Sequence, residues 1–304
     1  MIAALRHFHG TFLSGWWRRP TEHFTVFAGP MAGPLVPVRA PFGSYYADPF
    51  IRVHQDEPWL FLEEFRFPHN RGRLVARRLS GGPVLPITLA GPGHASFPCV
   101  FAAEGQLFLL PETGNTGTLD LYVCERFPDR WRLVRRLADN LDAADTVPLR
   151  HDGRWWFITS VRRSRSDGGH RSLAIFHTED LLGGALTAHP VNTERRHAAS
   201  PYSSGRNAGA IIPLPDGQLL RPVHASQRYY GENLGWNRID ELSPAIFRET
   251  SLDTAPACLA ALPRLPLHHV SAHEGWLACD TRDRVPFGLK PPADSPSANA
   301  ARTR

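Results

Sequence analysis

The sequence predicts an all-β fold, a five-bladed β-propeller with about four strands in each blade. First, a short apolar strand, a turn and a second apolar strand recur five times along the 304 residues. Strand pairs that repeat at roughly 50 residues are typical of propeller blades. Second, the 28 prolines and 25 glycines indicate many turns rather than long helices. Two ordinary β-sandwiches are the alternative, because strands at such spacing also build sandwiches.

Each of the five copies opens with a polar or proline-containing segment and continues through a turn into a second strand. The paired segments are 47–51 with 59–64, 96–101 with 107–112, 145–149 with 155–158, 206–212 with 219–222, and 267–270 with 276–280. Four of the turns contain glycine, which accepts the positive φ of a tight hairpin. We expect each pair to form the inner strands of a blade, with segments such as 119–123 and 131–134 outside them.

The blade pattern predicts one propeller domain over residues 1–284, because all-β domains often exceed 200 residues as one unit. Within it, residues 1–45 lead into the first blade and supply an outer strand that closes the ring and protects its edge. Residues 285–304 are mainly Pro, Ser, Ala and Arg, with little apolar surface to bury. They are therefore predicted to form a disordered tail.

The net charge of +5 comes from arginine, since Lys290 is the sole lysine of the sequence. Its arginine pairs are scattered without interleaved aromatic residues, so we expect no nucleic-acid partner. The four cysteines lie far apart, which disfavours a zinc site. No apolar run reaches about 18 residues, which predicts no transmembrane segment and, most simply, a cytoplasmic protein. The apolar stretch 12–17 leaves attachment to a membrane surface or a partner open.

Several short motifs occur in order along the chain. They are YADPF at 46–50, FLEE at 61–64, SFP at 96–98, PE at 111–112, ADT at 144–146, HDGRWW at 151–156, RP at 221–222, and Gln227 before YYG at 229–231. On these residues the chain, over about 46–280, resembles the family named for the N-terminal domain of glucosamine inositolphosphorylceramide transferase, in a stand-alone bacterial form. The resemblance implies a five-bladed propeller connected with glycan assembly.

That family is in turn similar to the five-bladed furanosidases of glycoside hydrolase family 43, in blade number and in the Ala-Asp-Pro opening. There, an Asp that opens the first blade serves as general base, a later Asp modulates acidity, and a Glu after it acts as general acid. Asp48 and Asp145 match the first two positions. The third does not carry over, because residues 205–209 read Gly-Arg-Asn-Ala-Gly. The missing carboxylate argues against simple inverting hydrolysis.

The candidate catalytic residues are Asp48, Glu112 and Asp145. Inner strands of all blades converge on the propeller axis, so carboxylates distant in sequence can act together there, and glycoside chemistry needs two carboxyl groups with opposed roles. Structural alternatives exist for each residue. Asp48 also suits a turn before proline, Asp145 a hydrogen bond at a blade junction, and Glu112 an ion pair with an arginine.

The candidate substrate-binding residues offer donors and acceptors for hydroxyls, carboxylates or phosphates, although each alone is equally at home in a salt bridge or on the surface. They are Glu64, Arg206, Arg221, Gln227, Tyr230 and His268. Glu63 and Glu64 point to opposite faces of a strand, so only one reaches the axis, and we favour Glu64. The resemblance places His268 near a central cation, yet a single imidazole is commonly just hydrogen-bonded, so we expect no metal and no cofactor.

Two functional hypotheses follow. The first is a carbohydrate-active propeller that acts on a glycan or activated sugar, by hydrolysis or by glycosyl transfer in polysaccharide or glycolipid assembly. The second is a non-catalytic sugar-binding propeller that serves a glycan biosynthesis enzyme. The retained acidic openings favour the first, whereas the missing fourth-blade carboxylate favours the second or a transferase.

Overall fold

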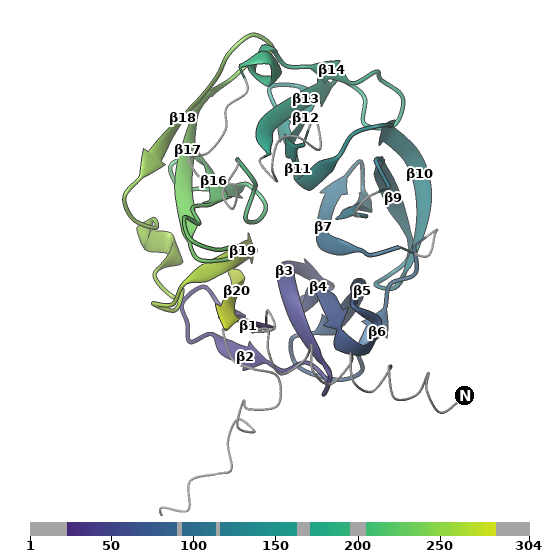
Figure 1. Ribbon diagram of the computed structural model, residues 1–304, viewed down its shortest axis with the longest axis vertical. Coiled ribbons are helices and arrows are strands. Elements are labelled where there is room, and N and C mark those ends of the chain that lie inside the picture. Colours follow the sequence, from purple (N-terminus) through teal and green to yellow (C-terminus); the bar gives the residue numbers. More distant parts are fainter. Residues whose placement is uncertain (1–22, 90–92, 114–115, 163–170, 195–204, 284–304) are drawn as a thin grey trace, which may run out of the picture. The chain divides into compact units, whose positions relative to one another are not determined.

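A computed structural model describes residues 23–89, 93–113, 116–162, 171–194 and 205–283. Within residues 24–281, a single compact unit, the strands form five four-stranded sheets in a ring (Figure 1). The predicted five-bladed β-propeller is confirmed, and the alternative prediction of two β-sandwiches is wrong. Among the described residues, no helix is long and apolar enough to cross a membrane.

The blades follow one another along the chain, each antiparallel from its inner to its outer strand. Blade 1 contains β3 (Ser44–His54), β4 (Glu57–Arg66), β5 (Arg71–Arg78) and β6 (Leu85–Pro86); blade 2 contains β7 (Ser96–Ala103), β8 (Gln106–Glu112), β9 (Leu119–Arg126) and β10 (Arg130–Ala138). Blade 3 contains β11 (Ala143–His151), β12 (Arg154–Val161), β13 (Ser172–Thr178) and β14 (Thr187–Ala188); blade 4 contains β15 (Ile212–Pro213), β16 (Leu219–His224), β17 (Leu234–Leu242) and β18 (Phe247–Leu252).

Blade 5 is assembled from both ends of the chain. Its inner strands are β19 (Leu267–His273) and β20 (Trp276–Asp283), and its outer strands are β1 (His23–Pro30) and β2 (Val36–Val38). The pairing of β20 with β1 joins sequence-distant segments in one sheet, so the ring has no exposed seam there. Residues 1–22, including the apolar stretch 12–17, and the predicted tail 285–304 lie outside the described residues.

The core lies between neighbouring blades and is built from their second strands. Leu60, Phe61 and Leu62 of β4 are fully buried, as are Trp156 and Phe157 of β12. Three consecutive buried side chains are expected where both faces of a strand are covered, and each contributes about 1.5–3 kcal/mol of hydrophobic stabilisation.

A β-bulge recurs near the start of the innermost strands. The pairing register shifts between Ala47 and Phe50, between Ser96 and Cys99, between Ala144 and Val147, and between Leu267 and His269. In three of these bulges a non-glycine residue takes a positive φ, namely Asp48 at 50°, Phe97 at 47° and Asp145 at 53°. A positive φ at a non-glycine residue costs free energy, and the bulge changes the direction of the side chains. Contacts with the surrounding structure must therefore stabilise this conformation.

Blade 4 departs from the predicted pattern. Of the inner segment 206–212, Ile212 alone enters a named strand, and a single bridge joins Asn207 to Val223. Gly209 has φ of 141°, and a Cβ there would lie 1.8 Å from the carbonyl oxygen of Val270. The backbone of blade 5 therefore approaches too closely for a regular inner strand, and the prediction of a full strand at 206–212 was wrong.

Candidate functional site

Carboxylates connect the bulged strands from one blade to the next. Asp280 Oδ2 accepts the backbone N–H of Asp48 at 2.9 Å, and Asp48 Oδ2 accepts that of Phe97 at 3.2 Å. Glu112 Oε2 likewise accepts the N–H of Asp145 at 3.1 Å. A bulge removes its N–H from the strand ladder, and a buried N–H needs another acceptor. Each bulge thus brings an acidic side chain from the preceding blade to its own position.

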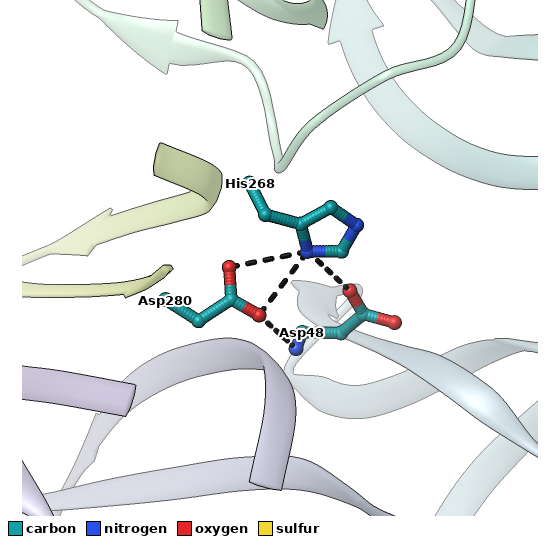
Figure 2. A group of neighbouring side chains, drawn as sticks. All are labelled: Asp48, His268 and Asp280. Atoms are coloured by element: carbon teal, nitrogen blue, oxygen red, sulfur yellow. Dashed lines mark hydrogen bonds and ion pairs between the residues drawn. The ribbon is translucent and has the colours of Figure 1, made fainter. Parts of the chain in front are cut away.

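The first group of side chains, the histidine cluster, consists of Asp48, His268 and Asp280 (Figure 2). His268 Nδ1 lies 3.2 Å from both carboxylate oxygens of Asp280 and 3.7 Å from Asp48 Oδ1. Burial raises the pKa of Asp48 to about 7, against the opposing charge of His268. Burial alone would lower the pKa of His268, but the carboxylate of Asp280 outweighs it and the pKa is raised. The cluster therefore gains or loses a proton near neutral pH.

The second group, the arginine cluster, consists of Glu112, Asp145 and Arg206. Arg206 Nε donates to Asp145 Oδ2 at 2.5 Å, and the amide of Asn207 donates to the Asp145 carbonyl oxygen at 2.7 Å. Burial, followed by the charge of Asp145, raises the pKa of Glu112 to about 7. Asp145 is therefore held in an ion pair with Arg206, and Glu112 titrates near neutrality.

Tyr230 joins the two clusters. Its hydroxyl lies 2.8 Å from His268 Nε2, and the guanidinium of Arg206 lies 4.9 Å from its ring centroid. Burial raises the pKa of the Tyr230 hydroxyl far above its ordinary value, so the phenol stays protonated. The structure thus brings Asp48, Glu112 and Asp145 together with Arg206, Tyr230 and His268. These six residues and Asp280 are the inner cluster.

Of the two adjacent glutamates of β4, it is Glu63, and not Glu64 as expected from the sequence, that interacts with the inner cluster. Glu64 Oε2 lies 2.6 Å from Arg73 Nε, an ion pair within blade 1. The pKa of Glu63 is raised well above its ordinary value, first by burial and then by the charges of Asp48 and Glu112. Sequence reasoning missed Glu63 because alternation shows that only one of the pair faces the cluster, without showing which one.

Two further predicted binding residues lie outside the inner cluster. Arg221 is 2% exposed and bidentate to Glu249, with Nε to Oε2 at 2.8 Å and Nη2 to Oε1 at 2.6 Å. It also donates to Asn207 Oδ1 at 3.0 Å, so it braces blade 4. Gln227 is exposed, and its backbone N–H donates to Glu232 at 2.9 Å.

The sequence analysis also missed Asp280, His224 and His269. Asp280 lies on β20 opposite His269, after the register shift of its blade, whereas Glu112 pairs with Ser96 before the shift of blade 2. His269 is 1% exposed, neither ring nitrogen has a hydrogen-bond partner among the described residues, and burial lowers its pKa to about 4. Nothing local in the sequence marks Asp280 or the two histidines.

The histidine cluster is also the candidate metal site. One ligand atom from each of Asp48, His268 and Asp280 lies within 4.8 Å of the others, and all three residues are buried. Carboxylate oxygens with one imidazole suit divalent cations of intermediate hardness. Both carboxylates already accept backbone N–H groups, so a bound cation would share them with the strand junctions.

Solved structures with a similar fold include glycoside hydrolases. An endo-1,4-β-xylanase from Bacteroides thetaiotaomicron superposes with a TM-score of 0.53 and 12% identity, over 78% of this chain and 87% of that one. A family 62 glycoside hydrolase in complex with xylotriose gives a TM-score of 0.52 and 13% identity, over 77% and 76%. At these identities the likeness is one of fold.

The family is defined by sequence. Residues 23–257 match the family described as glucosamine inositolphosphorylceramide transferase 1, N-terminal, and the chain belongs to that family. The transferase of that name from Oryza sativa subsp. japonica is 28% identical over 278 residues, 86% of this chain and 37% of its own length. The one from Arabidopsis thaliana is 28% identical over 69% of this chain and 27% of its length. The resemblance inferred from the motifs is confirmed, and the chain spans about a third of these relatives.

Proposed function

We propose that the chain is a carbohydrate-active propeller that binds a sugar-containing substrate at the inner cluster and acts on its glycosidic or activated bond. The convergence of Asp48, Glu112 and Asp145 from three consecutive blades carries this proposal. Arg206 and Tyr230 supply donors for hydroxyl or phosphate oxygens beside them. The fold and family are carbohydrate-related, which supports the substrate class, while hydrolysis or transfer in glycan assembly is the proposed chemistry.

Glu112 and Asp48 take the opposed acid and base roles. Burial, with a further contribution from the charge of Asp145, raises the pKa of each of the two carboxyl groups to about 7, so each can hold a proton near neutral pH. Glu112 is half-buried and the more accessible of the two, and its pKa of about 7 suits a general acid near neutral pH. Asp48, whose Oδ1 lies 3.7 Å from His268 Nδ1, takes the role of the base, and Asp145 positions Arg206.

A non-catalytic sugar-binding propeller that serves a glycan biosynthesis enzyme is the second candidate. It is favoured by blade 4, where Arg206 and Asn207 stand in place of an acidic residue. The relatives extend well beyond the matched region, which fits a binding role beside a separate transferase. We further propose a cytoplasmic location, because all four cysteines are free, as in a reducing compartment.

The test uses Asp48→Asn and Glu112→Gln, which keep shape and remove charge. We expect neither variant to lower the melting temperature, and each to lose about 10²–10⁴-fold in turnover of glycosides or activated sugars. Asp152→Asn is the control, because Asp152 lies in the turn at the opposite end of β11 and its side chain is 80% exposed.

Melting temperature, sugar binding and turnover together distinguish a structural role of the carboxylates, an enzyme and a binding propeller. Unchanged binding and turnover with lowered thermal stability would show that both carboxylates are structural partners only. Lost binding at unchanged stability, with no turnover by the wild type, would establish the binding propeller in place of the enzyme.

A further inference from the structure

Glu63 lies beside the inner cluster, and its carboxyl group occupies the space that a side chain at position 72 would fill. Glu63 is 7% exposed and pairs with Ala47 of β3 and Leu74 of β5. A Cβ at Gly72 would lie 2.0 Å from Glu63 Oε1, and the next two nearest atoms, Cδ and Cγ, also belong to Glu63. The φ of Gly72 is not positive, so the backbone does not require glycine there. The missing side chain makes room for the carboxyl group.

The backbone of Gly72 also fixes the imidazole of His94. The Gly72 N–H donates to His94 Nδ1 at 2.9 Å, and the Gly72 carbonyl oxygen accepts the N–H of Ala95 at 3.2 Å. A ring nitrogen that accepts a hydrogen bond carries no proton, so the proton of neutral His94 is on Nε2. Burial lowers the pKa of His94, which keeps the ring neutral at pH 7. His94 therefore offers a single N–H donor, at Nε2.

Glu63 is the acidic residue next to this donor. His94 Nε2 lies 3.8 Å from Glu63 Oε1, and within the described part of the chain Glu63 forms no other ion pair. This distance is longer than a hydrogen bond, and contacts of this kind in unliganded sites often tighten when a ligand binds. Because Oε1 is the oxygen beside an N–H donor, a proton on the carboxyl group belongs on Oε2.

One short segment connects Glu63 with the acids of the inner cluster. His94, at one end of the segment, approaches Glu63. Phe97, at the other end, donates its N–H to Asp48 Oδ2, and the first residue of β7 between them pairs with Glu112. Three Cα–Cα steps of about 3.8 Å join the two ends, so these contacts lie along at most about 11 Å of chain. Glu63 is therefore a near neighbour of both proposed catalytic carboxyl groups.

Glu63 is protonated near neutral pH, unlike a typical surface glutamate. Its pKa is raised well above the ordinary value, first by burial and then by the charges of the inner cluster's carboxylates. Burial and like charges both favour the neutral form of a carboxyl group. The neighbouring Glu64 differs, because Arg73 compensates its charge. A neutral carboxyl group can donate a hydrogen bond, which a carboxylate cannot.

We propose that Glu63 is a further binding residue of the site, a neutral acid that donates a hydrogen bond from Oε2 to an uncharged oxygen of the substrate, such as a sugar hydroxyl. His94 is its positioning residue, because its Nε2–H faces Oε1 and leaves Oε2 as the donor. This inference rests on the proposed function. It adds a neutral donor to the cationic donor Arg206.

The first test compares glutamine with leucine at position 63. Glu63→Gln keeps a neutral donor, because its amide oxygen can accept from His94 while its NH₂ group takes the place of Oε2. Glu63→Leu has a similar size and no donor. Binding and turnover of aryl glycosides and nucleotide sugars are measured. We expect Glu63→Gln to stay close to the wild type and Glu63→Leu to bind about tenfold more weakly. Equal losses in both variants would show that a charged carboxylate is needed, and no loss in either would exclude a binding role.

The second test displaces the carboxyl group without changing it. Gly72→Ala places a Cβ where Glu63 Oε1 lies, so it should weaken binding about as much as Glu63→Leu. In a Glu63→Ala background the space is empty, and the same substitution should have no further effect on binding. Equal effects of Gly72→Ala in both backgrounds would mean that Gly72 does not position Glu63.

The third test needs no substrate. The infrared difference spectrum between the wild type and Glu63→Gln at pH 7 should contain the C=O band of a protonated carboxyl group. The control is Asp152→Asn, whose difference spectrum should contain carboxylate bands, because the Asp152 side chain is 80% exposed. Carboxylate bands from Glu63 would overturn the neutral donor and leave the proposed function intact. If instead Asp48→Asn and Glu112→Gln keep full binding and turnover, the proposed function fails, and the binding role of Glu63 fails with it.

Discussion

The two halves of the inner cluster share a backbone device and differ in the cation that their carboxylates face. In both, a carboxylate accepts the N–H of a bulge in the next blade. The histidine cluster then places an imidazole between Asp48 and Asp280, whereas the arginine cluster places a guanidinium against Asp145. An imidazole changes charge near neutral pH and a guanidinium does not. The bulges thus position the acids, and the two halves differ in their cation: the imidazole of His268 can change its charge, whereas the guanidinium of Arg206 stays charged while Glu112 titrates.

The largest expected effect is on stability, from removing the permanent cation. Arg206→Met leaves Asp145 buried without its partner and should lower the free energy of unfolding by about 3 kcal/mol. Arg248→Met breaks an exposed pair with Glu241, and should cost less than about 1 kcal/mol. Chemical denaturation of both variants measures the difference. Equal losses of unfolding free energy in the two variants would mean that Asp145 is not stabilised by the guanidinium of Arg206.

The second prediction concerns pH and uses Glu112→Gln. The folded-state pKa of Glu112 lies near 7, above its ordinary 4.5, so its protonated form stabilises the fold below 4.5 and this contribution is lost as pH rises through 7. The free energy of unfolding of the wild type, relative to that of the variant, should therefore fall by about 3 kcal/mol across this window. Denaturation at a series of pH values measures it. A difference that stays flat or rises would contradict the shift.

Replacing His268, the titratable cation, should lower the free energy of unfolding by less than replacing Arg206, the permanent cation. His268→Gln keeps a polar side chain between Asp280 and Tyr230, and we expect a loss of about 1–2 kcal/mol, below that of Arg206→Met. Denaturation under the same conditions ranks the two variants. A loss larger than that of Arg206→Met would reverse the comparison between the two clusters.

The features that repeat from blade to blade could be predicted from the sequence, whereas those that depend on strand register or ring closure could not. The openings at Asp48 and Asp145 recur in phase, so their convergence could be predicted. Glu63 opposes Ala47 across β3 and β4, and the bulge that fixes this register leaves no local signal. Asp280 lies 232 residues from the N–H of Asp48 that it accepts, so only ring closure brings them together. The interruption of the inner strand of blade 4 was not predicted, because it depends on the close approach of Gly209 to the backbone of Val270 in another blade.

The smallest effect should come from the link between the halves. Tyr230→Phe keeps the ring beside Arg206 and removes only the hydroxyl that bonds His268 Nε2, so it should cost about 1 kcal/mol. The same substitution in a His268→Gln background should cost less, because the partner is already altered, and the difference is the coupling energy of the bond. Tyr230→Leu, which also removes the ring, should add the loss of the cation–π contact, about 0.5–1 kcal/mol. Equal costs of Tyr230→Phe in both backgrounds would mean that the two clusters are independent, and proton uptake by the histidine cluster would then leave the arginine cluster unaffected.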